Sequence, residues 1–472
     1  MPSAWVIGVG RDNGRVDLEQ FAALRTGEGS AALDAAARVA GGDPLTAAAA
    51  LRSAGVPAGL AAAALTQAEL RRRAAGKFGP SAAGMFFTRP GLEQATRQVV
   101  ARRRAERLRA AGVATLADLG CGLGADALAA ARAGIRVYGV EADPVTAALA
   151  EANARAAGLA ELFTVECGDA TAFDVTRVEA VFCDPARRRA GTGRRIFDPN
   201  AYSPPWDFVA GLADRVPYTV VKVAPGLDHA LIPPGAEAEW VSVDGDLVEA
   251  TLWCGPLAEH PRRATLLKEG PPVNASGSKG APFYHSADHS ADHSPDRSAG
   301  WKSVHQLTGS GRAEAPVGPV LRFVYDPDPA VVRAHLVAEL AAELDATLAD
   351  PTIAYLYGDD ATPTPYARCL EVTDVLPFSL KRLRALLRER RVGRVEILKR
   401  GSALEPERLR RDLRLTGDQP ASLVLTRVAG APAVLVCRPS APRAAATESP
   451  WAEARAGDQA AAEPLARGAD GD

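Results

Sequence analysis

A glycine-rich stretch from Thr115 to Asp126 constrains the fold of this 472-residue chain more than any other feature. An apolar segment over 113–119 ends in three glycines at alternate positions, Gly120, Gly122 and Gly124, and an alanine-rich stretch follows. This pattern predicts a strand, a tight turn and a helix, because glycine accepts a positive φ and lets a ligand approach the backbone. The free N–H groups at the start of the helix would point toward that ligand.

Asp118 comes just before the glycines and places a carboxylate at the end of the predicted strand. The pyrophosphate of a dinucleotide would be repelled at this position. A cationic group, such as the amino group of a methionine moiety, would be attracted. Taken alone, the turn is also compatible with an ordinary strand–helix connection that binds nothing.

Three further predicted strands each end next to a carboxylate. They are 135–140 before Glu141, 162–167 before Asp169, and 178–183 before Asp184. Ligands bind outside the carboxyl ends of parallel strands, so these acids and Asp118 are expected to face one crevice. Glu141, about 17 positions after Gly124, suits the hydroxyls of an adenosine ribose, and Asp169 suits an adenine amino group. Chance placement of four acids is much less plausible than chance placement of one.

With these motifs, the sequence resembles the class I S-adenosylmethionine (AdoMet) methyltransferases over residues 111–268. The resemblance implies an α/β fold with a Rossmann-like sheet of seven strands and AdoMet as cofactor. A predicted fifth strand over 218–223 and a predicted hairpin over 240–253 support the same fold. The cofactor-binding residues that it implies are Asp118, Gly120, Gly122, Gly124, Glu141, Asp169 and Ala170.

In many of these enzymes a segment before the glycines folds over the cofactor, and Phe87-Thr88 resembles such a lid. Phe87 and Thr88 are therefore further predicted cofactor contacts. The alternative is a loop that plugs a hydrophobic core with Phe86 and Phe87.

The acceptor side of the predicted site is Asp184-Pro185-Ala186-Arg187. It stands where amino-methylating members carry Asn or Asp, two prolines and an aromatic residue. The resemblance implies that Asp184 and the Pro185 carbonyl accept the amino protons, so these two are the predicted catalytic residues. Ala186 and Arg187 depart from the pattern, and a turn or helix-cap role for Asp184 is the alternative.

Ser203-Pro204-Pro205-Trp206 has the look of the missing tetrapeptide, although Ser203 could instead cap a helix that begins with prolines. The Asp-Pro-Ala-Arg run is also similar to a turn of uracil-C5 methyltransferases, which need a cysteine after the fifth strand. Residues 223–226 contain none. Cys121, Cys167 and Cys183 are interpreted as small buried residues. No cysteine–histidine spacing indicates zinc, and no metal is expected.

Two basic segments are candidates for contacts with phosphates. Arg187 and Arg188 follow the predicted catalytic turn and are candidate substrate-binding residues, with a solvated loop as the alternative. The segment 381–414 holds 13 basic and 5 acidic residues in a chain of net charge −2. This local excess favours a nucleic-acid-binding face, although the surface charge of a helix explains part of it.

Composition divides the chain into five parts. Residues 1–110 read as a helical domain that ends in a helix over 92–111, and 111–268 form the methyltransferase core. A linker over 269–316 contains three His-Ser-(Ala/Pro)-Asp repeats and is expected to be disordered rather than metal-binding. An α+β domain over 317–440 begins with a strand and a helix over 329–348. An alanine- and acid-rich tail over 441–472 is also expected to be disordered.

The second half of the 317–440 domain has the order strand, helix, strand, strand, which is half of a ferredoxin-like unit. It resembles the THUMP-like C-terminal domain of some bacterial methyltransferases, and THUMP domains serve RNA-modifying enzymes. The resulting prediction is an AdoMet-dependent methyltransferase that modifies RNA, with a base amino group as the favoured acceptor. The alternatives are a small-molecule methyltransferase and a non-catalytic AdoMet- or RNA-binding protein.

The location of the protein is predicted from what the sequence lacks. No signal-peptide pattern and no unbroken run of 18 apolar residues is present. The scattered cysteines fit a reducing compartment. A cytoplasmic protein without a membrane partner is therefore expected.

Overall fold

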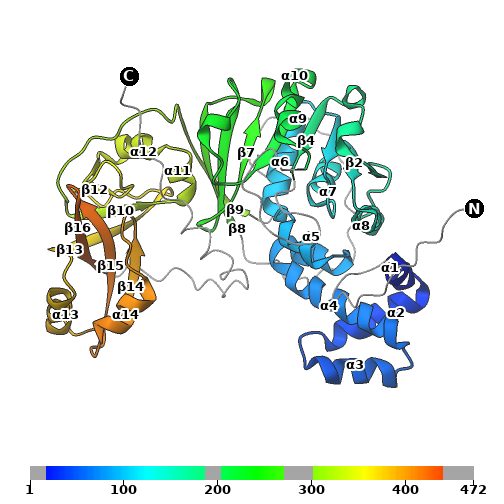
Figure 1. Ribbon diagram of the computed structural model, residues 1–472, viewed down its shortest axis with the longest axis horizontal. Helices are drawn as coiled ribbons and strands as arrows, with labels where there is room; N and C mark the ends of the chain where they lie inside the picture. The colour runs from blue at the N-terminus through cyan, green and yellow to red at the C-terminus, as the bar shows by residue number, and fades with distance from the viewer. Residues whose placement is uncertain (1–17, 186–202, 270–300, 439–472) are drawn as a thin grey trace, which may run out of the picture.

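The computed structural model describes residues 18–185, 203–269 and 301–438. Helices occupy the N-terminal end, a large mixed sheet lies in the middle, and a second sheet with its own helices forms the C-terminal end (Figure 1). The α/β Rossmann-like class is thereby confirmed. Within the described residues, none of the helices is long and apolar enough to cross a membrane.

The N-terminal helices pack through alanine and leucine side chains. The helices are α1 (Leu18–Leu24), α2 (Gly27–Val39), α3 (Pro44–Ser53), α4 (Ala58–Phe78), η1 (Gly79–Gly84), α5 (Arg89–Gln94) and α6 (Gln98–Ala110). The single helix predicted over 92–111 is wrong. The chain leaves the helical conformation at Ala95, with ψ 135°, and the hydroxyl of Thr96 hydrogen-bonds Asp126 at 2.7 Å instead.

The central sheet has the order β3-β2-β1-β4-β5-β7-β6-β8-β9. Its first seven strands are β1 (Thr115–Leu119), β2 (Arg136–Glu141), β3 (Phe163–Cys167), β4 (Ala180–Cys183), β5 (Tyr218–Val223), β6 (Glu237–Val243) and β7 (Asp246–Trp253). Strands β1 to β5 run parallel, and β7 runs antiparallel to both β5 and β6. All five parallel strands therefore end at one edge of the sheet.

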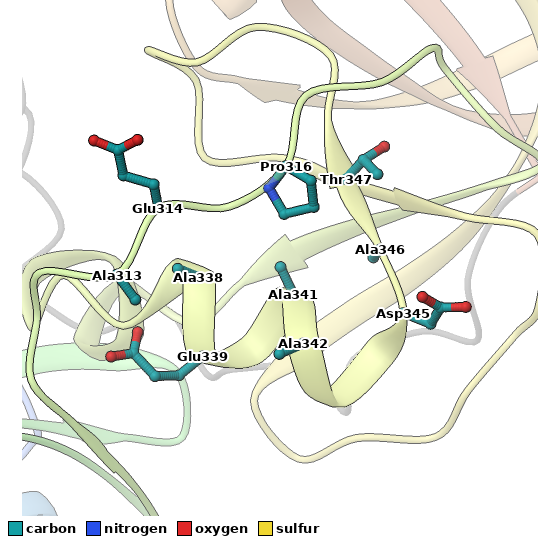
Figure 2. Close-up of a pocket in the computed structure, with 10 residues that line it drawn as sticks. All are labelled: Ala313, Glu314, Pro316, Ala338, Glu339, Ala341, Ala342, Asp345, Ala346 and Thr347. Atoms are coloured by element: carbon teal, nitrogen blue, oxygen red, sulfur yellow. The ribbon is translucent and has the colours of Figure 1, made fainter.

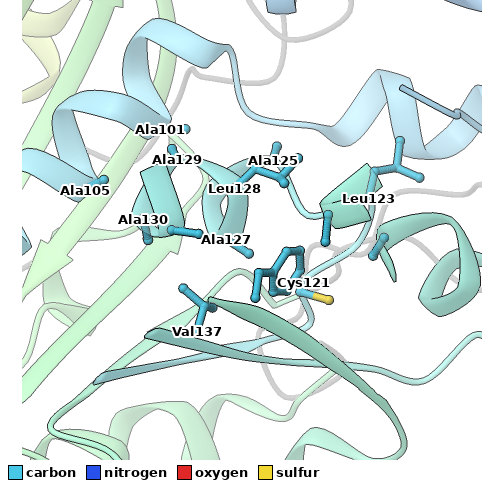
Figure 3. Close-up of a cluster of buried hydrophobic side chains, with 14 of the residues drawn as sticks. Ala101, Ala105, Cys121, Leu123, Ala125, Ala127, Leu128, Ala129, Ala130 and Val137 are labelled. Carbon is cyan, nitrogen blue, oxygen red and sulfur yellow. The ribbon is translucent and has the colours of Figure 1, made fainter. Parts of the chain in front are cut away.

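Helices cover both faces of this sheet. On one face, α6, α7 (Ala125–Arg132) and α8 (Pro144–Ala156) pack on the strands, mostly through alanines. Figure 3 shows alanines of α6 and α7 close together beside Cys121 and Val137. The small side chains let α7 lie close to the strands, and this fixes its N-terminus at the glycine turn. The other face is covered by α9 (Trp206–Ala210) and α10 (Leu212–Arg215).

Two strands that the sequence did not predict extend the expected seven to nine. β8 (Arg262–Glu269) pairs parallel with β6, and β9 (Trp301–Gly309) pairs antiparallel with β8. The prediction of a disordered linker over 269–316 is therefore wrong for 301–309. The histidine repeats, and with them the rest of 270–300, lie outside the described residues, as do 1–17 and the tail beyond 438.

The C-terminal sheet has the order β11-β12-β10-β13-β16-β15-β14. Its strands are β10 (Phe323–Pro327), β11 (Thr347–Leu348), β12 (Leu356–Gly358), β13 (Ala367–Pro377), β14 (Val392–Lys399), β15 (Gln419–Val428) and β16 (Ala431–Cys437). Two helices, α13 (Leu380–Glu389) and α14 (Pro406–Leu413), cover one face of β14 to β16 through leucines.

The helix predicted over 329–348 is divided into α11 (Pro329–Arg333) and α12 (Val337–Leu344). His335, with φ +59°, lies between them and changes the direction of the chain. Both helices thereby bury residues such as Val331 and Leu340 in the same hydrophobic cluster as Trp240 of the central sheet. The first part of the predicted C-terminal domain therefore shares a core with the central sheet.

Candidate active site

The glycine turn between β1 and α7 has positive φ at all three alternate glycines. The surroundings of Gly122 and Gly124 show that these two glycines have different roles. A Cβ added at Gly122 would meet no atom within 4 Å, so the space above that residue is open. A Cβ at Gly124 would lie 2.7 Å from the ring of Phe163. Gly122 therefore leaves room for a ligand, whereas Gly124 allows the turn to pack on β3.

Asp118 is the most unusual carboxylate of the site. Its side chain is 1% exposed, and neither oxygen has a hydrogen-bond partner among the described residues. Burial raises its pKa well above the ordinary value, the charges of Asp126 and Asp184 act in the same direction, and Arg104 opposes them. A buried carboxyl group without a partner is costly, and a bound cation would remove that cost.

Glu141 is the last residue of β2 and holds the glycine turn by hydrogen bonds. Its Oε2 accepts from the N–H of Gly122 at 3.0 Å, and its Oε1 accepts from the N–H of Asp143 at 3.0 Å. Burial raises the pKa of Glu141, and these N–H groups oppose the increase. The carboxylate is thus held directly beside the open space at Gly122.

Asp169 lies at the end of β3, at the same edge of the sheet, but it is exposed. Its carboxylate accepts from the N–H of Thr171 at 2.8 Å and caps the short helix Ala170–Ala172. That N–H lowers the pKa of Asp169. Part of its hydrogen-bonding capacity is therefore already used within the protein.

Asp184 follows β4 and adjoins the glycine turn, because a Cβ at Gly120 would lie 3.6 Å from its carbonyl oxygen. Its Oδ2 accepts a hydrogen bond from Lys222 Nζ of β5 at 2.6 Å. The side chain of Asp184 is 30% exposed and that of Lys222 is 10% exposed. A partly open carboxylate is thus paired with a buried ammonium group.

Lys222 is itself held by a chain of polar groups. Its Nζ also donates to Thr96 Oγ1 at 3.0 Å, and Thr96 donates to Asp126 Oδ2 at 2.7 Å. Arg104 pairs with Asp126 and with Glu249. Burial lowers the pKa of Lys222, but the charges of Asp184, Glu249 and Asp126 raise it by more. Lys222 is therefore an ammonium group.

Sequence reasoning missed Lys222, Thr96 and Arg104. One signal for Lys222 was available, because it is the only charged residue in the apolar segment 218–223. Thr96 carries no such signal, because its partner Lys222 is 126 positions away.

The predicted lid residues belong to the protein interior. Phe87 is fully buried, and its ring centroid lies 5.6 Å from that of Phe78. The backbone N–H and C=O of Phe87 both hydrogen-bond the side chain of Gln67. The prediction that the Phe87 ring covers a cofactor is thus wrong, and the alternative of a core plug holds. Thr88 caps α5 by accepting from the N–H of Gly91 at 3.0 Å.

The plug segment is nevertheless attached to the glycine turn. Asn153 of α8 is fully buried. Its Oδ1 accepts from the N–H of Phe86 at 2.7 Å, and its Nδ2 donates to the carbonyl of Leu123 at 3.0 Å. The N-terminal helices therefore support the turn from behind.

The structure describes only some of the remaining predicted site residues. Pro185 is buried, while Arg187 and Arg188 lie outside the described residues. Pro205 is the N-cap of α9, which has no side-chain cap bond, so the interpretation of Ser203 as a cap is wrong. Trp206 is buried in the core.

The cysteines differ from one another. Cys121 and Cys183 are buried, and burial raises the pKa of both thiols well above the ordinary value. Cys167 is exposed, contrary to expectation.

A cavity of about 400 Å³ lies between α12 and the residues around Pro316 (Figure 2). Alanines of α12 form much of its wall, and the carboxylates of Glu314, Glu339 and Asp345 lie around it. None of the predicted site residues lines this cavity.

Comparisons with known proteins identify the family of the chain. A family model described as a methyltransferase domain matches residues 116–187, one described as THUMP domain-like matches 367–439, and a domain of unknown function matches 17–74. Two curated relatives from Mycobacterium tuberculosis, strains CDC 1551 / Oshkosh and ATCC 25618 / H37Rv, are each called an uncharacterized S-adenosylmethionine-dependent methyltransferase. Each is 36% identical over 388 residues, which span 79% of this chain and 95% of the relative.

A crystal structure from Porphyromonas gingivalis W83, which carries a provisional methyltransferase assignment, matches with a TM-score of 0.63. The match covers 90% of this chain and 100% of the other at 19% identity, so it supports the fold.

Proposed function

The chain belongs to the S-adenosylmethionine-dependent methyltransferases with a C-terminal THUMP-like domain, and from this premise we propose that it methylates RNA. It is an enzyme, and AdoMet is its cofactor. The observation that carries the RNA proposal is the THUMP-like match over 367–439, because THUMP domains serve RNA-modifying enzymes. An RNA substrate also fits the expected cytoplasmic location.

A basic face on the two helices that cover the C-terminal sheet supports the same proposal. We define it by five exposed residues on and just after α13 and α14 that have no ion pair within the described part of the chain. They are Lys381, Arg382, Arg388, Arg411 and Arg414. Such a surface can bind phosphates through released counterions without reading sequence.

The structure reduces the charge of this region below the value that the sequence suggests. Arg390 pairs with Asp374 at 2.6 Å, and Arg391 pairs with Asp418 at 3.3 Å. Both acids lie outside the basic segment 381–414. The proposed RNA contact is therefore limited to the basic face.

The residues at the ends of β1 and β2 fit AdoMet. Asp118, buried without a partner, would hold the amino group of its methionine part. Gly122 and the N-terminus of α7 would admit the rest of that part. Glu141 would accept from the ribose hydroxyls, and Asp169 with Ala170 would bind adenine. When bound, AdoMet supplies a methyl group on a sulfonium centre with a neutral thioether as leaving group.

The chain itself orients the acceptor. The Oδ1 atom of Asp184 and the carbonyl of Pro185 would accept the acceptor's protons and direct its lone pair, which contributes through orientation. Arg187 and Arg188 would bind adjacent phosphates. The likeness of Asp184 and Pro185 to the corresponding residues of amino-methylating enzymes favours a base amino group. The raised pKa values of Cys121 and Cys183 disfavour a thiolate nucleophile.

The test uses the purified full chain with methyl-labelled AdoMet and total RNA from cells that lack the gene. We expect label in RNA, and mass spectrometry of the nucleosides should find one modified nucleoside missing from the deletion strain. RNA from cells that carry the gene is the control, since its sites are already methylated. Label in small metabolites and none in RNA would favour the small-molecule alternative. Absence of any AdoMet turnover would favour a binding protein.

A further inference from the structure

We propose that Lys222, anchored by Thr96, is a positioning residue that fixes the orientation of the Asp184 carboxylate. The proposal rests on the proposed function insofar as Asp184 faces the acceptor. It adds two residues, from β5 and from the α5–α6 connection, that the sequence did not indicate. It also gives the N-terminal helices a part in the acceptor site.

Two hydrogen bonds fix the position of the Lys222 ammonium group. Its ammonium group lies between Asp184 Oδ2 at 2.6 Å and Thr96 Oγ1 at 3.0 Å. Thr96 is buried, and its own proton is donated to Asp126. The Thr96 hydroxyl is fixed by its hydrogen bonds to Asp126 and Lys222. Rotation of the Lys222 side chain would break its hydrogen bonds to both Thr96 and Asp184. Asp184 is therefore held through Oδ2.

This arrangement leaves Asp184 Oδ1 for the substrate. Within the described residues, Oδ1 has no hydrogen-bond partner, and the side chain is 30% exposed. A carboxylate held by one oxygen offers the other in a defined direction. Catalysis gains from such preorganisation because the group need not be reoriented during the reaction.

The charges around Lys222 explain why a buried lysine stays charged there. Asp184, Glu249 and Asp126 face it, and Lys77 of α4 is close enough to oppose them. Arg104 neutralises part of Asp126 and Glu249. Removing the ammonium group would leave these three carboxylates with Arg104 and Lys77 as the named cations, and Asp184 would lose the hydrogen bond that holds its Oδ2. The turnover number kcat therefore reports on the pairing.

The experiment compares two matched pairs of variants in the full chain. Lys222→Met removes the charge, and Lys222→Arg keeps it. Thr96→Val removes the hydroxyl, and Thr96→Ser keeps it. Thr219→Val is the control, because its buried hydroxyl bonds the carbonyl of Val216 and does not touch Lys222.

For each variant, kcat and KM with RNA are measured, with AdoMet affinity by calorimetry and the melting temperature. We expect Lys222→Met to lower kcat by about 100-fold with KM and AdoMet affinity within a few-fold. Lys222→Arg should restore part of kcat. Thr96→Val should lower kcat by about 10-fold, while Thr96→Ser and Thr219→Val should resemble the wild type.

A purely structural role predicts a different result. The melting temperature, AdoMet affinity and kcat would then fall together, Lys222→Arg would not recover kcat, and Thr219→Val would behave like Thr96→Val. That outcome would overturn the proposal. If the wild type methylates no RNA, the proposed function fails separately. Carbon NMR of labelled aspartate, assigned with Asp184→Asn, then tests the pairing of Lys222 with Asp184. An Asp184 carboxylate signal with the same chemical shift in the wild type and in Lys222→Met would reject it.

Discussion

Replacing Asp118 by asparagine should change stability and cofactor affinity in opposite directions. The side chain is 1% exposed and both oxygens lack partners, so the ionised form is costly in the protein without AdoMet. An unpaired buried polar group costs about 1–3 kcal/mol, and more when it is charged. Asp118→Asn keeps the shape and the unpaired polar group but removes the additional cost of the charge. We therefore expect a higher melting temperature without cofactor, by about 2–4 °C per kcal/mol gained.

The same change should weaken AdoMet binding. A hydrogen bond to a charged group contributes about 1.5–3 kcal/mol, which corresponds to a loss of affinity of roughly 10- to 150-fold. The stabilisation of the protein by saturating AdoMet should shrink accordingly. A variant that melts higher alone but gains less from AdoMet would separate a binding role from a general defect.

The pH dependence follows from the raised pKa of Asp118. Because the folded pKa exceeds the unfolded one, the group favours folding at low pH and loses that contribution as pH rises through the folded pKa. Binding of a cation needs the ionised form, so AdoMet affinity should rise with pH over the same range. Asp118→Asn should show neither dependence.

Calorimetry and thermal melting between pH 5 and 8 measure both effects. Asp174→Asn is the control, because Asp174 is an exposed carboxylate that hydrogen-bonds Thr176. Unchanged AdoMet affinity in Asp118→Asn would refute the assignment of the amino group to Asp118. A lower melting temperature without cofactor would refute the argument from burial.

Three further predictions concern the other parts of the site. Glu141→Gln should weaken AdoMet binding about 10-fold by calorimetry, since one charged hydrogen bond to the ribose is lost; unchanged affinity would contradict the assignment. Asp184→Ala should abolish turnover but leave AdoMet affinity within a few-fold, because a group that acts on the acceptor affects rate more than cofactor binding; full activity would reject it. Arg382→Ser combined with Arg411→Ser should reduce the slope of log RNA affinity against log salt concentration by about 1.4. Arg322→Ser combined with Arg438→Ser should not change that slope, because both of these arginines are paired with Glu371.

The C-terminal variants are best studied in the full chain. A fragment that begins at residue 317 would expose Val331 and Leu340, which pack against Trp240 of the central sheet. Failure of such a fragment to bind RNA would then reflect misfolding as readily as the absence of an RNA site. The salt dependence of the full chain avoids this ambiguity.

Local sequence was sufficient for the strand ends and the turn between β1 and α7. The alternating glycines, the apolar run before them and the acids at the ends of β2, β3 and β4 are all visible within short windows. Residue type and spacing determine such features because φ preferences and strand periodicity act over a few residues. The parallel order of β1 to β5 then follows from the chirality and the connections of α/β units.

Contacts between distant residues decided the rest. The sequence shows that Thr96 and Lys222 exist, but only the tertiary fold places the α5–α6 connection beside Lys222 of β5 and Asp126 of α7. It likewise shows the charges of 381–414 but not that Asp374 and Asp418 neutralise two of them. Phe87 illustrates the same limit, since a lid and a core plug share one sequence and differ only in what surrounds the ring. Partner choice depends on the three-dimensional position of the backbone, and short-range patterns carry no information about it.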